Sequence, residues 1–228
     1  MNWVVEQTLL SKLFAYLCMC GLLFLPHISQ ATGSGSTAWY ATHQFQAADI
    51  KKLEAGRVVL QNQTLEGAPA EHVQAFIIVD APVTHVFALI KDFPQLVAYA
   101  PYVENIEVLR QSEQQAVVNY ALALPFGVTS RYRLQLSFEQ HGLSRTMVWK
   151  SVPWAGLKAE ETIVSSTGYW WLEPGQDDGQ TLLTYQTITD PGHVPFGLGW
   201  IVDILSRSGV VDLLKSTKQR AEQSWEQR

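Results

Sequence analysis

Six segments rich in β-branched and aromatic residues follow one another between residues 103 and 189, and no other feature constrains the fold as much. Turn residues bound each segment and short links join them, which predicts successive antiparallel strands in a meander. The predicted strands are Val103 to Leu109, Gln115 to Leu124, Ser130 to Glu139, Arg145 to Val152, Gly168 to Glu173 and Thr181 to Thr189.

Helical periodicity flanks this run on both sides. After Pro82, apolar residues recur at helical spacing up to Pro94, which predicts a helix followed by a short helical turn over Gln95 to Tyr99. From Phe196 onward the same period predicts a C-terminal helix of about 25 residues. Upstream, Arg57 to Gln63 and Val73 to Val79 are predicted strands, and Ala47 to Ala55 is a predicted short helix. The chain therefore belongs to the α+β class.

The links between the predicted strands are of two kinds, and the two kinds alternate. Three are polar: Gln111 to Gln114, Gln140 to Ser144 and Pro174 to Gln180. Three repeat proline, an aromatic residue and a nearby glycine, and they contain Phe126, Trp154 and Phe196. Because successive turns of a meander lie at opposite ends of a sheet, the three aromatic links should gather at one end. We interpret them as the rim and lid of an apolar cavity that touches a membrane; the alternative is that they plug the end of the sheet as core.

The N-terminus has the features of an export signal. Leu13 to Leu25 is uncharged and apolar, Pro26 follows it, and small residues precede Thr32. We therefore divide the chain into a signal peptide over residues 1–31, a leader with a short helix over 32–56, and one domain over 57–228. Both cysteines lie within the predicted signal, so the mature chain would have no disulfide and no thiol nucleophile. We expect an exported protein, periplasmic in a bacterium.

Composition favours a large apolar interior and argues against nucleic-acid binding. Apolar residues make up 47% of the chain and charged residues 16%, with a net charge of −5 and no basic tract. The histidines show no metal-ligand spacing, and we expect His43, His72, His85, His141 and His193 to lie in loops or on the surface. No phosphate loop or nucleophile motif is present, so we expect neither a catalytic residue nor a metal site.

Several motifs resemble the helix-grip family of START-type, coenzyme-Q-binding and polyketide-cyclase-like domains. The opening motifs are Ala81-Pro82-Val83, Val86-Phe87, Asp92-Phe93 and Tyr99-Ala100-Pro101-Tyr102-Val103. Later motifs are Gly168-Tyr169-Trp170, Leu172-Glu173-Pro174, Thr184-Tyr185 and Asp190-Pro191-Gly192. The resemblance implies a curved antiparallel sheet wrapped around a long C-terminal helix. It also implies a sterol, phospholipid, isoprenoid quinone or polyketide as ligand, but it carries over no defined set of binding residues.

These patterns together predict a cavity between the sheet and the final helix. Along the strand Ser130 to Glu139, apolar and polar side chains alternate, so the apolar ones share one face, which should point inward. Tyr120, Trp149 and Trp170 could join that face. With the rim and the helix, the expected cavity and lid residues are Phe126, Tyr132, Leu134, Leu136, Trp149, Trp154, Trp170, Phe196, Trp200, Ile201 and Leu205.

We expect a monomeric, non-enzymatic carrier that binds a lipid or isoprenoid quinone, needs no cofactor and contacts a membrane surface transiently. One alternative is an enzyme of the cyclase or dehydratase type on the same fold, which would need acid or base groups deep in the cavity. The other alternative is an envelope module whose aromatic end docks another protein.

Overall fold

The computed structural model describes Tyr40 and residues 43–62, 71–158, 162–190, 200–205 and 207–227. The predicted signal peptide, Phe196 and His193 lie outside these ranges, so their predictions stay predictions. In the part of the chain that is described, no helix is long and apolar enough to cross a membrane.

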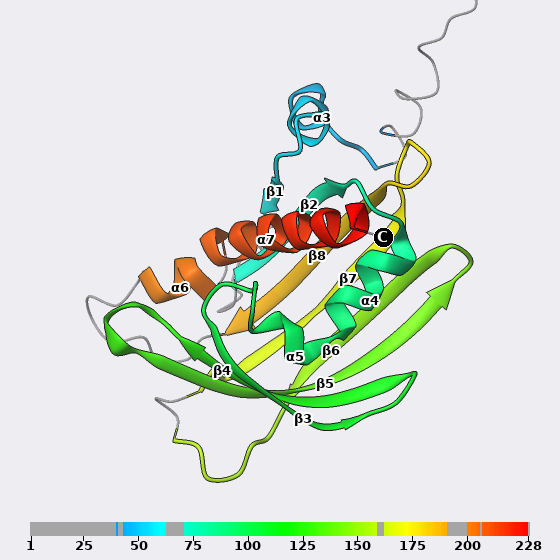
Figure 1. Ribbon diagram of the computed structural model, residues 1–228. Helices are drawn as coiled ribbons and strands as arrows, with labels where there is room; N and C mark the ends of the chain where they lie inside the picture. Colours follow the sequence, from blue (N-terminus) through cyan, green and yellow to red (C-terminus); the bar gives the residue numbers. More distant parts are fainter. Residues whose placement is uncertain are drawn as a thin grey trace, which may run out of the picture. The chain divides into compact units, whose positions relative to one another are not determined.

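An eight-stranded antiparallel sheet forms the centre of the fold (Figure 1). All six predicted meander strands are confirmed, and each pairs with its neighbours in sequence. Their observed bounds are β3 Val103–Gln111, β4 Gln115–Ala123, β5 Thr129–His141, β6 Ser144–Val152, β7 Ser165–Pro174 and β8 Thr181–Asp190. The strands β1 Val59–Asn62 and β2 Glu71–Val79 continue the sheet beyond β8, so the spatial order is β1-β2-β8-β7-β6-β5-β4-β3. The sequence therefore predicted the helix-grip sheet correctly.

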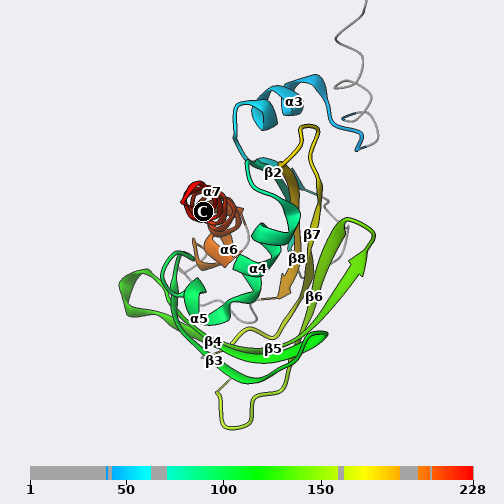
Figure 2. The ribbon, with the colours of Figure 1, turned by 45° about the vertical axis from the view of Figure 1, so that its right-hand side comes forward.

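Four helices lie on the concave side of the curved sheet, as the two ribbon views show (Figure 2). They are α4 Val83–Lys91, α5 Phe93–Leu96, α6 Trp200–Leu205 and α7 Arg207–Glu226. Pro94 lies in the first turn of α5, where its missing N–H costs nothing, so this turn begins two residues before the predicted one.

The buried core lies between these helices and the concave face. Along β2, Val73, Ala75, Ile77 and Val79 point into it, whereas Phe76 and Ile78 point to the opposite face. On that opposite face, Phe76 and Ile78 pack with side chains of the short helix α3 Ala47–Glu54 and the residues around it. The predicted short helix is thus confirmed, and it covers the end of the sheet formed by β1 and β2.

The predicted single C-terminal helix is instead two helices, α6 and α7. Where they meet, the backbone of Gly209 approaches the carbonyl oxygen of Ile204 so closely that a Cβ at this position would collide with it. The hydroxyl of Ser208 lies 3.3 Å from the carbonyl oxygen of Asp203. The helical period predicted burial of Val211 and Leu214, and α7 buries Leu214 but Val210 in place of Val211.

One histidine prediction is wrong. His85 is buried on α4, where its Nε2 lies 2.9 Å from Ser224 Oγ and 3.1 Å from the carbonyl oxygen of Ala221. Its ring packs against the Trp225 indole at 5.3 Å between centroids. The side chain thus contributes to the contact between α4 and α7, a contact that the spacing of histidines along the sequence does not indicate.

Candidate ligand cavity

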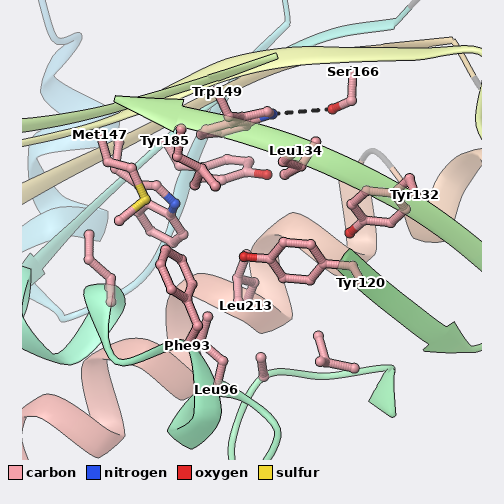
Figure 3. Close-up of a pocket in the computed structure, with 15 residues that line it drawn as sticks. Phe93, Leu96, Tyr120, Tyr132, Leu134, Met147, Trp149, Ser166, Tyr185 and Leu213 are labelled. Atoms are coloured by element: carbon pink, nitrogen blue, oxygen red, sulfur yellow. Dashed lines mark hydrogen bonds between the residues drawn. The ribbon is translucent and has the colours of Figure 1, made fainter. Parts of the chain in front are cut away.

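A cavity of about 120 Å³ lies between the concave face of the sheet and the helices (Figure 3). Residues Ile90, Phe93 and Leu96 of α4 and α5 and Leu213 of α7 form one side. Strands β4 to β8 form the other side. The residues that these strands contribute are Tyr120, Tyr132, Leu134, Leu136, Met147, Trp149, Ser166, Trp170 and Tyr185. Ala100, between α5 and β3, and Val103, at the start of β3, complete the lining.

Five of the eleven predicted cavity and lid residues line this cavity. On β5, Tyr132, Leu134 and Leu136 all point inward because alternate side chains of a strand share one face. Trp149 and Trp170 join them from the neighbouring strands β6 and β7. The structure thus brings together the whole sheet-based part of the predicted site.

Trp149 is held in place by two features of β7. Its indole lies across Gly168, where any Cβ would collide with the ring and with the backbone carbonyl of Gln186. Its Nε1 donates a hydrogen bond of 3.2 Å to Ser166 Oγ, and the indole stacks on Tyr185 at 5.2 Å between centroids. Glycine at position 168 therefore leaves room for the Trp149 ring against the backbone of β7.

The aromatic links lie elsewhere. Phe126 is 90% exposed in the turn between β4 and β5, with a positive φ of 60°, so it does not plug a core. Trp154 lies over the guanidinium of Arg133, 5.3 Å from its carbon to the ring centroid. Arg133 alternates with Tyr132 along β5 and so faces the convex side, where its Nε donates a 2.7 Å hydrogen bond to Asn119. The structure places Trp154 there, away from the cavity.

The predicted helix residues are placed differently from expectation. Ile201 is half-buried on α6 but does not line the cavity, and Trp200 and Leu205 are described only as backbone positions of α6. From the described part of the C-terminal helices, the side chain that lines the cavity is Leu213 on α7. The prediction assumed one continuous helix and took its lining residues from the part that forms α6, so it did not include Leu213.

Sequence reasoning missed part of the polar lining. Tyr120 was expected to face inward, and its ring stacks on Tyr132 with 5.3 Å between centroids and 10° between planes. Tyr185 and Ser166 were not predicted to line the cavity. The alternation Leu183, Tyr185, Thr187 along β8 would have indicated Tyr185, whereas Ser166 precedes the predicted start of its strand.

Burial keeps the cavity tyrosines uncharged. Removal from water raises the pKa of Tyr120 well above its usual value, with smaller contributions from Tyr132, Tyr185 and Tyr99. Burial likewise raises the pKa of Tyr132 and of Tyr185. Among the described residues, no Asp, Glu, His, Lys or Arg lines the cavity, and no group of acidic, histidine or cysteine side chains could hold a metal. The cavity thus offers neutral hydroxyls within an apolar surface.

The curved antiparallel sheet and the long C-terminal helix over it form a helix-grip fold. No family model and no curated protein matches the chain. Among solved structures, the STAR-related lipid transfer protein from Xanthomonas axonopodis aligns with a TM-score of 0.62 at 19% identity, covering 72% of this chain and 93% of its own. Human StAR-related lipid transfer protein 5 aligns with a TM-score of 0.63 at 13% identity, covering 84% of this chain and 98% of its own.

An enzyme has the same architecture. The Zhui aromatase/cyclase from a Streptomyces species aligns with a TM-score of 0.52 at 15% identity, covering 68% of this chain and 94% of its own. At these identities the likeness establishes the fold alone.

Proposed function

We propose that this protein binds a hydrophobic ligand, a lipid or an isoprenoid quinone, in the cavity beneath α7 and carries it within the cell envelope. The observation that supports the proposal best is the apolar cavity itself, lined by side chains from six strands and three helices. A ligand that enters it gains roughly 25 cal/mol for each Å² of apolar surface removed from water. Similarity in fold to lipid-transfer proteins agrees with this function. The export signal predicted over residues 1–31 supports the envelope location.

Native mass spectrometry of the protein expressed from its full sequence tests this proposal. We expect an added mass that disappears after lipid extraction and returns on incubation with the extracted lipid. In Leu213→Trp, a larger side chain at the cavity wall should prevent the return, because it occupies the space that the ligand needs. The matched control is Leu143→Trp, at a leucine that is 75% exposed in the turn between β5 and β6. Protein that never carries or takes up lipid would refute the proposal.

Loading of the cavity at a bilayer is the second part of the proposal. Phe126 exposes its ring in the link between β4 and β5, at the end of the sheet where β7 begins. Such an aromatic ring inserts favourably at the level of lipid headgroups. Phe126→Ser should reduce sedimentation with phospholipid vesicles in protein that remains folded. Leu143→Ser, at an exposed leucine of the opposite end, is the control and should sediment like the wild type. Equal sedimentation of both variants would exclude contact through Phe126.

An enzyme of the cyclase or dehydratase type is the second candidate, since the cavity encloses the hydroxyls of Tyr120, Tyr132 and Tyr185. Their raised pKa values suit them to donate hydrogen bonds to a developing oxyanion rather than to abstract protons. Conversion of a bound polyketide-like diketone by the wild type, but not by Tyr132→Phe, would favour the enzyme over the carrier.

A further inference from the structure

The two ends of the cavity differ in polarity. Tyr120 and Tyr132 pair across β4 and β5 close to the link that joins these strands, and Ser166 lies at the start of β7, at the same end of the sheet. Further along the strands, Met147 pairs with Trp170, and Phe93 approaches from α5. Figure 3 shows Tyr132 and Ser166 on one side and Met147 and Phe93 on the other, with the hydroxyl of Tyr120 turned toward the middle of the cavity. The cavity therefore has a hydroxyl end and a hydrocarbon end.

The hydroxyls at the first end are available to a ligand. Within the described part of the chain, Tyr120 and Tyr132 contact each other through their rings, and no hydrogen bond joins either phenol to another residue. Ser166 is less available, because it accepts from the Trp149 indole and forms a 3.3 Å hydrogen bond with the hydroxyl of Thr189. A phenol enclosed in an apolar cavity gains by donating to an acceptor oxygen there.

The same surroundings disfavour an anionic group. No cation lines the cavity among the described residues, so a phosphate or carboxylate placed there would lose its hydration without gaining an ion pair. The volume of about 120 Å³ is also comparable with engineered cavities of about 150 Å³ that bind benzene. It suits a ring-sized group rather than the two chains of a phospholipid.

We propose that the cavity selects an uncharged, ring-sized group bearing a carbonyl or similar acceptor oxygen, with that oxygen at Tyr120 and Tyr132 and its apolar side against Met147 and Trp170. This inference rests on the proposed function and narrows its ligand class. It assigns to the two phenols a role in specificity, beyond their packing in the core.

Calorimetric titration of the lipid-extracted full chain with three matched probes tests the inference. The probes are butyrophenone, which carries the carbonyl, butylbenzene, which lacks it, and 4-butylbenzoate, which is anionic. We expect the ketone to bind about tenfold more tightly than the hydrocarbon, as one buried hydrogen bond allows, and the benzoate to bind at least about tenfold more weakly than the ketone.

Removal of the two phenols should abolish this preference. In the double variant Tyr120→Phe and Tyr132→Phe, we expect butyrophenone and butylbenzene to bind within about twofold of each other, with the butylbenzene affinity unchanged. Unchanged hydrocarbon binding also shows that the variant is folded; if the double variant does not fold, each single variant is titrated in the same way. Tyr169→Phe, which removes a phenol that bonds Gln186 on the convex face, should keep the wild-type preference.

The outcomes separate the two proposals. Equal binding of ketone and hydrocarbon by the wild type, a preference that survives in the phenylalanine variants, or tight binding of the benzoate overturns the ligand class and leaves the carrier function standing. Binding of none of the probes overturns the ligand class and counts against the carrier function as well.

Discussion

Replacement of Gly168 by alanine should destabilise the protein and obstruct its cavity. An alanine Cβ would collide with the Trp149 indole and with the Gln186 carbonyl oxygen, so the indole must move. Such overpacking costs about 1–3 kcal/mol, and loss of the hydrogen bond to Ser166 adds about 1 kcal/mol. We therefore expect the free energy of unfolding to fall by about 2–4 kcal/mol. The displaced ring would enter the space that a ligand needs.

Urea denaturation followed by circular dichroism measures the first effect, and titration with butylbenzene measures the second. Where no clash arises, a glycine-to-alanine substitution leaves the free energy of unfolding unchanged or raises it, because alanine restricts the unfolded chain. A decrease at position 168 would therefore indicate the clash with Trp149. Ser165→Ala, at an exposed position of the same strand, is the control and should change stability by less than about 0.5 kcal/mol. A Gly168→Ala protein with wild-type stability and wild-type probe affinity would refute this account of the cavity wall.

Three further predictions concern buried and convex-face residues. Thr217 is fully buried on α7 and its hydroxyl has no partner among the described residues, so Thr217→Val should raise the urea midpoint by the equivalent of about 1 kcal/mol; a lower midpoint would contradict this. Trp154→Ala should cost about 0.5–1 kcal/mol through loss of the Arg133 contact, yet leave butylbenzene affinity unchanged. Because burial raises the pKa of Tyr120 and Tyr132, the folded state holds protons that the unfolded state loses above pH 10.0. The contribution of these two tyrosines to the free energy of unfolding should thus be constant below that pH and fall above it. The free energy of unfolding should therefore fall less steeply with pH in the double phenylalanine variant than in the wild type. Equal slopes in the two proteins would argue against burial of these phenols.

The strands and their inward faces were predictable because a two-residue period fixes which side chains share a face. Tyr132, Leu134 and Leu136 were assigned to the cavity on that basis alone. The helical contribution was not predictable in the same way, since the prediction assumed one helix where the chain forms α6 and α7, and Leu213 of α7 lines the cavity. The repeat of proline, an aromatic residue and a nearby glycine suggested a common role for the links, but Phe126 is exposed in its turn and Trp154 lies over Arg133.

The contacts that sequence reasoning missed join residues that lie far apart in the sequence. Trp154 lies over Arg133 because the link between β6 and β7 reaches the convex face, and no local pattern records that contact. His85 is buried because α7 crosses α4, and the Ala221 and Ser224 groups that surround it lie at the far end of the chain. Periodicity specifies faces within one element, whereas these contacts depend on how separate elements meet.

The central claim is that an unfilled apolar space exists between the strands and α7, and a crystal structure of the lipid-extracted protein under xenon pressure tests it most directly. Xenon enters dry apolar cavities and scatters strongly enough to be located. We predict a xenon site in contact with Leu136, Met147 and Leu213. A structure in which the protein's own side chains fill this space, with no xenon among those three residues, would contradict the account.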